Sequence, residues 1–250
     1  MGLKEKKIAL VGGFRSGTNY TRTIMEWNYE CEMVYDAYGW KHGYIPIVSE
    51  GSPVARRTEP VVFVTKNPFS SIRSLYKYYK SVGRNVIADV GWKRFLRGRF
   101  ITYDYFLPKS PQYRYSNVVD YWNSMNWNYS SLGVNDSISV HVAYEEMLRK
   151  PLLASNAVAK TLGLSERYRS KKQFLVPEMV TKNMNDSERP NANIYVTDKR
   201  FNRLSYGDEA VFKVFDREDI EFILAHLDLE LVDRLNYTGI IERAEKLKFD

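Results

Sequence analysis

A glycine-rich loop near the start of the chain has the composition of a phosphate-binding site. It reads Gly12-Gly13-Phe14-Arg15-Ser16-Gly17-Thr18, between an apolar run at 7–12 and a segment with helical spacing at 18–29. Backbone N–H groups at a turn between a strand and a helix point toward one spot, and the helix dipole adds partial positive charge there. The loop therefore predicts binding of a phosphate group. The alternative is a glycine-rich turn without a ligand.

The position of the cation distinguishes this loop from that of the nucleoside triphosphatases. Their motif, G-x-x-x-x-G-K-[ST], has the glycine spacing of Gly12 and Gly17, but Thr18 stands where the motif has Lys. The cation here is Arg15, inside the loop. Because the missing Lys normally reaches the β- and γ-phosphates, the loop suits a 5′-phosphate that carries one further group.

The segments that would position the loop alternate between strand and helix patterns. Strands are predicted at 7–12, 60–65 and 137–143, and helices at 18–29, 70–81, 145–162 and 216–229. This order predicts an α/β fold: a single domain over 1–250, with a central, mainly parallel sheet flanked by helices and a phosphate loop like that of P-loop NTPases. Two stretches without clear periodicity, 98–115 and 182–208, are predicted to be loops that form lids or acceptor walls.

Composition sets wider limits on function. The chain has 250 residues, 44% of them hydrophobic, and a net charge of +7, which suits an anionic partner. No apolar run is long enough to predict a membrane span, and the N-terminus lacks the pattern of a signal peptide. Cys31 is the only cysteine, and the three histidines are scattered. The sequence thus predicts a cytoplasmic, metal-independent protein.

The loop also resembles the first signature of the sulfotransferases that use 3′-phosphoadenosine-5′-phosphosulfate (PAPS). That signature is a strand, a [K/R]-S-G-T loop and a helix, and Arg15-Ser16-Gly17-Thr18-Asn19-Tyr20 matches it. The resemblance implies that residues 15–19 hold the 5′-phosphosulfate. It also implies that Tyr20 occupies the place of a family Trp that packs against the adenine.

A second segment resembles the family's 3′-phosphate site, a strand followed by R-[ND]-P and a Ser eight residues after the basic position. Here it reads Val64-Thr65-Lys66-Asn67-Pro68-Phe69-Ser70-Ser71-Ile72-Arg73-Ser74. The resemblance implies that Lys66 and Ser74 bind the 3′-phosphate, with Arg73 as a candidate helper. Lys66 replaces the usual Arg and cannot make its bidentate fork.

The third resemblance is to a Y-E-[DE]-M sequence that follows a strand and opens a helix ending in L-G-L. Tyr144-Glu145-Glu146-Met147 and Leu162-Gly163-Leu164 match it, and the resemblance implies that Tyr144 lies near the adenine. The segment 121–129 resembles the helix that precedes this strand in the family. In the last third of the chain, Arg200 and Arg203 are candidates for a basic loop that closes on the 3′-phosphate; the alternative is a solvated basic loop.

The family resemblance implies transfer of a sulfuryl group from PAPS to a hydroxyl or amine, with 3′-phosphoadenosine-5′-phosphate (PAP) as product and no metal. A cation near the departing phosphate stabilises the developing charge, and Arg15 is placed for this. The acceptor is predicted to be a saccharide or another hydroxyl compound, rather than nucleic acid.

The predicted general base is His42, in the segment 40–46. The family's cytosolic members have a Lys and a His followed by Pro in this interval, and Lys41 and His42 resemble that pair, although the family usually has one residue between them. A carboxylate is the alternative base, with Glu26, Glu30 and Asp36 as candidates. The other two histidines, His141 and His226, are predicted to be structural.

Two rival functions remain open at this stage. One is an ATP- and Mg²⁺-dependent phosphotransferase, against which Thr18 and Lys66 argue, because they stand where a Lys and an acidic residue are expected. The other is a non-catalytic binder of RNA or another polyanion, suggested by the net charge and the 14% of aromatic residues.

Overall fold

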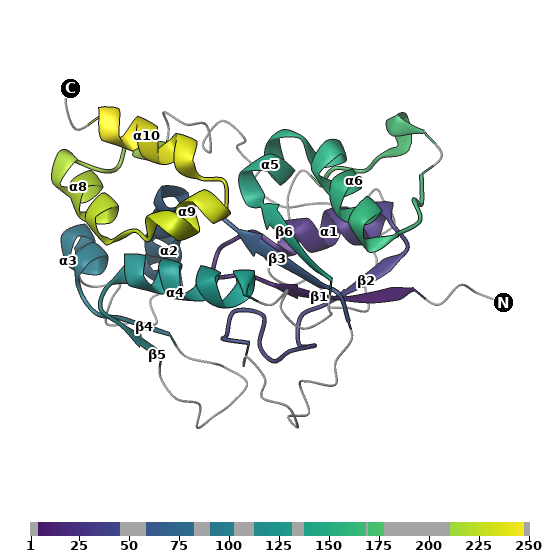
Figure 1. The fold of residues 1–250 in the computed structure, drawn as a ribbon, viewed down its shortest axis with the longest axis horizontal. Helices are drawn as coiled ribbons and strands as arrows, with labels where there is room; N and C mark the ends of the chain where they lie inside the picture. Colours follow the sequence, from purple (N-terminus) through teal and green to yellow (C-terminus); the bar gives the residue numbers. More distant parts are fainter. Residues whose placement is uncertain are drawn as a thin grey trace.

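A four-stranded parallel sheet lies at the centre of the molecule, with the strand order β2–β1–β3–β6 (Figure 1). The computed structural model describes residues 5–45, 59–82, 91–102, 113–131, 138–168, 170–177 and 211–247. The strands of the sheet are β1 (Lys6–Val11), β2 (Cys31–Val34), β3 (Val61–Thr65) and β6 (Ser139–Ala143).

Helices surround this sheet and extend to one side of it. They are α1 (Thr18–Asn28), α2 (Pro68–Val82), α3 (Trp92–Arg97), α4 (Val118–Ser130), α5 (Tyr144–Arg149), α6 (Pro151–Leu162), α8 (Arg217–His226), α9 (Leu229–Arg234) and α10 (Thr238–Lys246). In Figure 1, α1, α5 and α6 gather at one side, while α2, α3, α4 and the C-terminal helices gather at the other.

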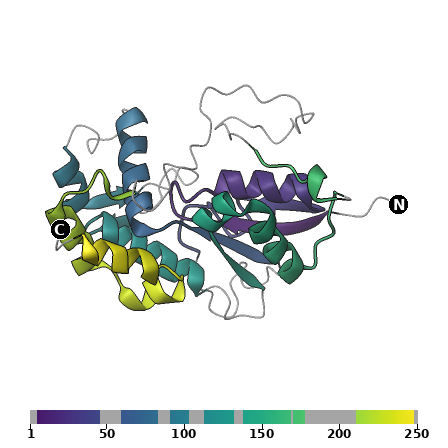
Figure 2. The ribbon, with the colours of Figure 1, turned by 90° about the horizontal axis from the view of Figure 1, so that it is seen from above.

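Alternating side chains of the strands enter two separate cores. Ile8 and Leu10 of β1 pack in a core with residues of α1, α5 and α6. Ala9 and Val11 belong to the other core, with residues of α2, α3, α4 and the C-terminal helices. Figure 2 shows these layers from above. Coverage of both faces explains why β1 and β3 are continuous apolar runs rather than alternating ones.

The predicted α/β class with a parallel sheet is confirmed, but two predicted helices are divided. The segment 145–162 forms α5 and α6, because Pro151 lacks the N–H that a continuous helix needs and Lys150 leaves the helical conformation (φ −133°, ψ 59°). The helix predicted at 216–229 ends at His226, and the side chain of Asp228 then caps α9.

The prediction of a long loop at 98–115 is wrong in part. Within it, β4 (Phe100–Thr102) pairs antiparallel with β5 (Tyr113–Tyr115), outside the main sheet. Residues 103–112 and the predicted loop at 182–208 lie outside the described residues. The aromatic residues of the hairpin pack inward: Phe100 and Tyr115 are both buried in the core with α4.

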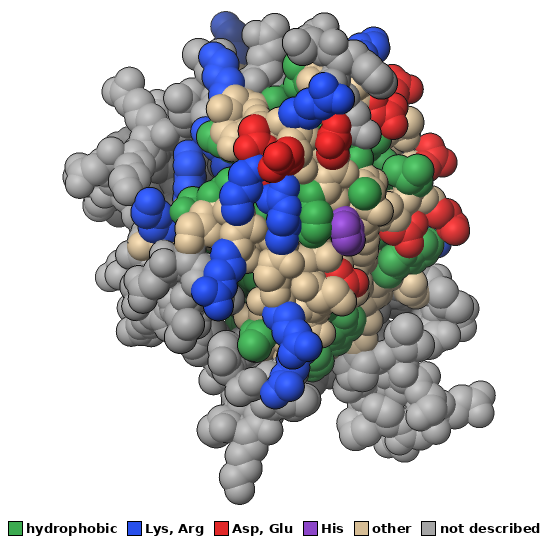
Figure 3. All heavy atoms as spheres, turned by 90° about the vertical axis from the view of Figure 1, so that its left-hand side faces the viewer, with side chains coloured by type: hydrophobic (Ala, Val, Ile, Leu, Met, Phe, Trp, Pro, Cys, Tyr) green, Lys and Arg blue, Asp and Glu red, His purple; other side chains and the backbone are tan. Residues whose placement is uncertain are grey.

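A buried carboxylate joins α3 to α8. Asp219 is 1% exposed and accepts hydrogen bonds from Trp92 Nε1 (2.6 Å), Lys93 Nζ (2.9 Å) and Arg97 Nη1 (2.9 Å). Figure 3 shows this side of the molecule, where Lys and Arg side chains lie close to Asp and Glu side chains. The junction therefore depends on one acid that two cations and an indole surround.

The sheet brings the segments that were predicted to bind the nucleotide to the carboxyl ends of its strands. The chain leaves β1, β3 and β6 at their carboxyl ends, into the loop 12–17, Lys66 and Tyr144 respectively. After β1 the chain returns to β2 on one side, whereas β3 lies on the other side of β1. Ligands of open α/β sheets bind at such a switch point, outside the carboxyl ends of the strands.

Candidate functional site

The loop of residues 12–17 packs closely against its neighbours as it turns from β1 into α1. Gly17 is the N-cap of α1, with φ +100°, and Arg15 has φ +64°, which is uncommon for a residue other than glycine. A Cβ on Gly17 would lie 2.1 Å from the ring of Tyr144, and one on Gly12 would lie 2.5 Å from the carbonyl oxygen of Val64. The glycines thus let the loop lie directly against β3 and α5.

Some polar groups of the loop are engaged within the protein and one is not. The N–H of Phe14 donates to the Tyr121 hydroxyl (2.8 Å), and the N–H of Ser16 donates to the Gly13 carbonyl (3.1 Å). The Ser16 hydroxyl is buried and has no hydrogen-bond partner in the part of the chain that the structure describes. Buried polar groups are nearly always paired, so this hydroxyl beside the N-terminus of α1 indicates room for a ligand oxygen.

Lys66 brings a second cation to the loop. Its side chain is 3% exposed, its ammonium lies 3.4 Å from the carbonyl oxygen of Arg15, and it stands over the ring of Tyr144, 4.6 Å from the centroid. Trp122 Nε1 donates to the backbone carbonyl of Lys66 (2.8 Å) and holds the turn after β3. Arg15 itself is exposed, with its guanidinium 5.3 Å from the ring centroid of Tyr78.

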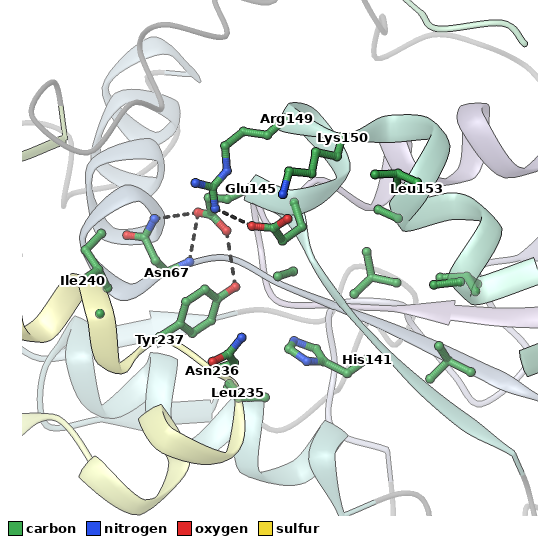
Figure 4. A pocket seen from close by; sticks show the side chains of 18 of the residues that line it. Asn67, His141, Glu145, Arg149, Lys150, Leu153, Leu235, Asn236, Tyr237 and Ile240 are labelled. Atoms are coloured by element: carbon green, nitrogen blue, oxygen red, sulfur yellow. Dashed lines mark hydrogen bonds and ion pairs between the residues drawn. The ribbon is translucent and has the colours of Figure 1, made fainter. Parts of the chain in front are cut away.

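A buried acid supports the turn that carries Lys66. Glu145 accepts from the N–H of Asn67 (3.1 Å), from Asn67 Nδ2 (2.6 Å) and from the hydroxyl of Tyr237 (3.3 Å), as Figure 4 shows. Burial raises the pKa of Glu145, and the charge of Lys66 opposes that shift. The acid therefore fixes Asn67, and its carboxyl group interacts with the charge of Lys66.

His42 lies against the start of the loop. Its Nδ1 is 2.6 Å from the Gly12 carbonyl oxygen, and its ring stacks on that of Phe14, with centroids 4.8 Å apart. Because a carbonyl only accepts, Nδ1 carries the proton and Nε2 keeps its lone pair. Burial, together with the charges of Lys41 and Arg15, lowers the pKa of His42 to about 3, although some of its surface stays exposed. The imidazole is therefore neutral at pH 7.

Lys41 is held by α1 rather than directed at the loop's centre. Its ammonium donates to Asn19 Oδ1 (2.7 Å) and lies 3.4 Å from the ring centroid of Tyr35. The Tyr35 hydroxyl donates to the same Asn19 oxygen (2.9 Å). The carbonyl of Lys41 accepts a hydrogen bond from the N–H of Gly12 (3.0 Å). Lys41 and His42 therefore both bond to the backbone of Gly12.

Other residues that were predicted to bind the nucleotide have different surroundings. Tyr20 is 2% exposed and packs in the core, with its ring centroid 6.0 Å from that of Tyr144. Its ring therefore has no exposed face on which an adenine could stack. Ser74 is half-buried on α2, and Thr18 is buried at the first position of α1. Arg200 and Arg203 lie outside the described residues.

The alternative bases have other surroundings. Glu26 receives two hydrogen bonds from Arg22 Nε (3.0 and 3.1 Å) and one from the N–H of Met33 (2.8 Å), which is a structural role. Asp36 is exposed. His141 has Nε2 2.7 Å from the Thr65 hydroxyl and stacks on Phe63, as expected of a structural histidine.

Sequence reasoning missed the residues that support the site. The sequence placed Tyr121 and Trp122 only in a helix. In the structure, the Tyr121 hydroxyl accepts a hydrogen bond from the Phe14 N–H, and the Trp122 indole donates one to the Lys66 carbonyl. Tyr237 bonds to Thr65 and Glu145 from 172 and 92 positions away, and no local pattern marks it. Glu145 was noted only as part of a motif, yet it bonds to Asn67 in the turn and its pKa responds to the charge of Lys66.

Comparison with known proteins adds no relative. The chain matches no family profile, and neither the curated proteins nor the solved structures include a significant match. Within the described residues, no group of three or more His, Cys, Asp or Glu side chains is arranged to hold a metal ion. Among the described helices, none has the length and apolar character that a membrane crossing requires.

Proposed function

We propose that the protein is a sulfotransferase that moves a sulfuryl group from PAPS to a hydroxyl of an acceptor, with a saccharide as the favoured acceptor class. In this proposal the loop 12–18 is a phosphate loop of the P-loop type, with its cation moved to Arg15. The proposal rests on the motifs of the sequence and on the surroundings of the loop.

The observation that carries the proposal is the meeting of three separate segments at the carboxyl edge of the sheet. Lys66 lies 3.4 Å from the loop at Arg15, and His42 lies 2.6 Å from it at Gly12. Two cations and a neutral histidine thus surround one loop at the N-terminus of α1. A nucleotide with phosphates at two positions and a transferable anionic group needs such a combination.

The residues present fit the phosphate groups of PAPS. The Ser16 hydroxyl is buried and has no hydrogen-bond partner among the described residues. The donor set is cationic and hydroxylic, which suits phosphate and sulfate oxygens. The N–H of Phe14 is committed to Tyr121, so this residue contributes its ring, not its amide, to the site.

The residues have separable roles in the transfer. PAPS supplies the sulfuryl group: the acceptor oxygen bonds to sulfur, the bond from sulfur to the phosphate oxygen breaks, and PAP leaves. His42 Nε2 accepts the proton of the acceptor hydroxyl, since Nδ1 is held by the Gly12 carbonyl. Arg15 and Lys66 balance the negative charge on the departing nucleotide.

The test is calorimetric titration of PAP beside AMP and ATP, without metal. We expect clear preference for PAP, and we expect Lys66→Met and Arg15→Ala to weaken it at least about tenfold, since each removes a charge-assisted contact. Lys160→Ala, an exposed cation on α6, is the matched control and should leave the affinity unchanged. Binding of ATP only with Mg²⁺ would replace the proposal with the phosphotransferase.

A second experiment separates binding from turnover. His42→Ala should keep the affinity for PAP but lose at least about 10²-fold in the release of PAP from PAPS with a panel of glycans and phenols. Unchanged turnover would remove His42 from the reaction. Salt-sensitive RNA binding, without turnover of PAPS on any acceptor, would favour the polyanion binder instead.

A further inference from the structure

A cavity lies along the outer edge of β6 and reaches Asn67, the residue after Lys66. Its volume is about 700 Å³, and it opens between α5 and α6 on one side and the α9–α10 turn on the other (Figure 4). None of residues 12–18 lines it, nor does His42. It is therefore distinct from the proposed phosphate loop, although Asn67 and Glu145, beside the Lys66 turn, also line it. Its size falls in the range of pockets that hold small organic ligands.

The walls of this cavity combine an apolar surface with cations. Val142, Leu153, Val158 and Ile240 provide apolar contacts from one strand, β6, and two helices, α6 and α10. The cations come from two sides: Arg149 and Lys150 from α5 and the residue after it, and Arg243 from α10. A ligand that satisfied both kinds of wall would need an apolar body and a negative charge.

The two acids of the cavity are already engaged. Glu146 pairs with Arg149 (2.5 Å), and Glu145 is buried behind Asn67 and Tyr237, which donate to it. By contrast, the Lys150 ammonium has neither an ion pair nor a hydrogen bond within the described part of the chain. The charge that faces the cavity without compensation is therefore positive.

We propose that this cavity is a second ligand site, which takes an amphipathic organic anion: an apolar body of aryl or alkyl carbon with a single carboxylate, sulfonate or sulfate head beside Lys150. Figure 4 shows the ammonium-bearing side chain of Lys150 and the side chain of Leu153 on the same side of the cavity. The site does not depend on the sulfotransferase proposal, because Lys150 and the apolar walls have no role in that proposal.

The test uses 8-anilinonaphthalene-1-sulfonate, an aryl sulfonate whose fluorescence rises in apolar surroundings. We expect saturable binding of one molecule per folded chain. Lys150→Glu reverses the charge beside the head group, and Ala157→Trp fills the cavity, so each should weaken binding at least about fivefold. Lys160→Glu, the same charge change on an exposed residue of α6 that does not line the cavity, should leave it unchanged.

Competition then defines the ligand class. Octanoate should displace the probe, whereas octylammonium and inorganic sulfate at the same concentration should not, because each lacks one of the two required features. Thermal unfolding of each variant checks that it is folded, and the two cavity variants act independently. Binding that both variants leave intact, the absence of saturable binding, or equal displacement by octylammonium would overturn the proposal.

Discussion

At the scale of single residues, Gly17 is the position of the site where a side chain is least tolerated. Its φ of +100° and the 2.1 Å between an added Cβ and the Tyr144 ring leave no room for a side chain. We predict that Gly17→Ala lowers the free energy of unfolding by about 1–3 kcal/mol, through backbone strain and displacement of the ring. Urea unfolding measures this. Gly239→Ala, in α10 with nothing near the added methyl, should be neutral or stabilising, and equal effects at both positions would contradict the argument.

The protonation of His42 gives a second prediction at this scale. In the free protein the pKa of His42 is about 3, so its ring stays neutral between pH 5 and 8. Negative charge beside an imidazole favours its protonated form, so bound PAP should raise this pKa. Titration of the ring by NMR, with His42→Gln to assign the signal, measures the change. A pKa that PAP does not move would show that the nucleotide lies away from His42.

Residue spacing was enough to predict some of these contacts, but not all. Arg15 and Lys66 lie in motifs whose local order implies a shared edge of a sheet, and the structure brings them together. The partners that hold them come from distant positions: Tyr121 reaches Phe14 across 107 residues, and Trp122 reaches Lys66 across 56. A one-dimensional pattern carries no information on which buried hydroxyl or indole will meet a given backbone group.

At the scale of elements, the apolar pattern predicted the strands that are buried on both faces and missed the shortest strands. The strands β1 and β3 are continuous apolar runs, so they were predicted within one residue or so. The strand β2 (Cys31–Val34) was missed, because it is four residues long and contains the acidic Glu32 on a half-exposed face. The hairpin β4–β5 was missed because its strands have three residues each, too few for a period to be recognised.

The junction of α3 and α8 provides the prediction for this scale. Asp219→Ala removes the acceptor that Trp92, Lys93 and Arg97 share. Lys93 keeps its pairs with Asp216 and Glu218, and Arg97 keeps the Glu218 carbonyl. The indole N–H of Trp92 loses the acceptor that the structure gives it. We expect a loss of about 1–3 kcal/mol in the free energy of unfolding, because the hydrogen bonds to one buried acceptor are lost. Glu218→Ala, one position away and 79% exposed, should cost less than about 1 kcal/mol, because its pair with Lys93 is at the surface. Urea unfolding compares them, and similar losses would mean that α8 docks through its apolar face alone.

At the scale of the whole molecule, the C-terminal residues are joined to the sheet through buried polar groups as well as apolar ones. Tyr237 bonds to Thr65 at the end of β3 (2.8 Å) and to Glu145 at the start of α5 (3.3 Å). The Thr65 hydroxyl also meets His141 (2.7 Å). This chain of contacts connects α10, the sheet and the Lys66 turn, so titration of its members should affect folding as a whole.

His141 makes that dependence measurable. Burial lowers its pKa to about 4, against about 6.5 when unfolded. Between these values the unfolded chain binds more protons than the folded one, so stability falls as pH falls from about 6.5 to about 4, and is fully present above 6.5. His141→Gln should flatten the dependence by at most about 1.4 kcal/mol per pH unit, the effect of one proton.

The measurement is the free energy of unfolding in urea at several pH values from 4 to 8. His226→Gln, a change at an exposed ring on α8, is the control, because both variants share every other titrating group, Glu145 and His42 included. The difference in slope between the unchanged protein and His141→Gln therefore reports His141, and His226→Gln shows the effect of the same substitution at an exposed ring. Parallel curves for the unchanged protein and His141→Gln would show that His141 is protonated equally in the folded and unfolded chains, and that the Thr65 contact does not depend on a neutral ring.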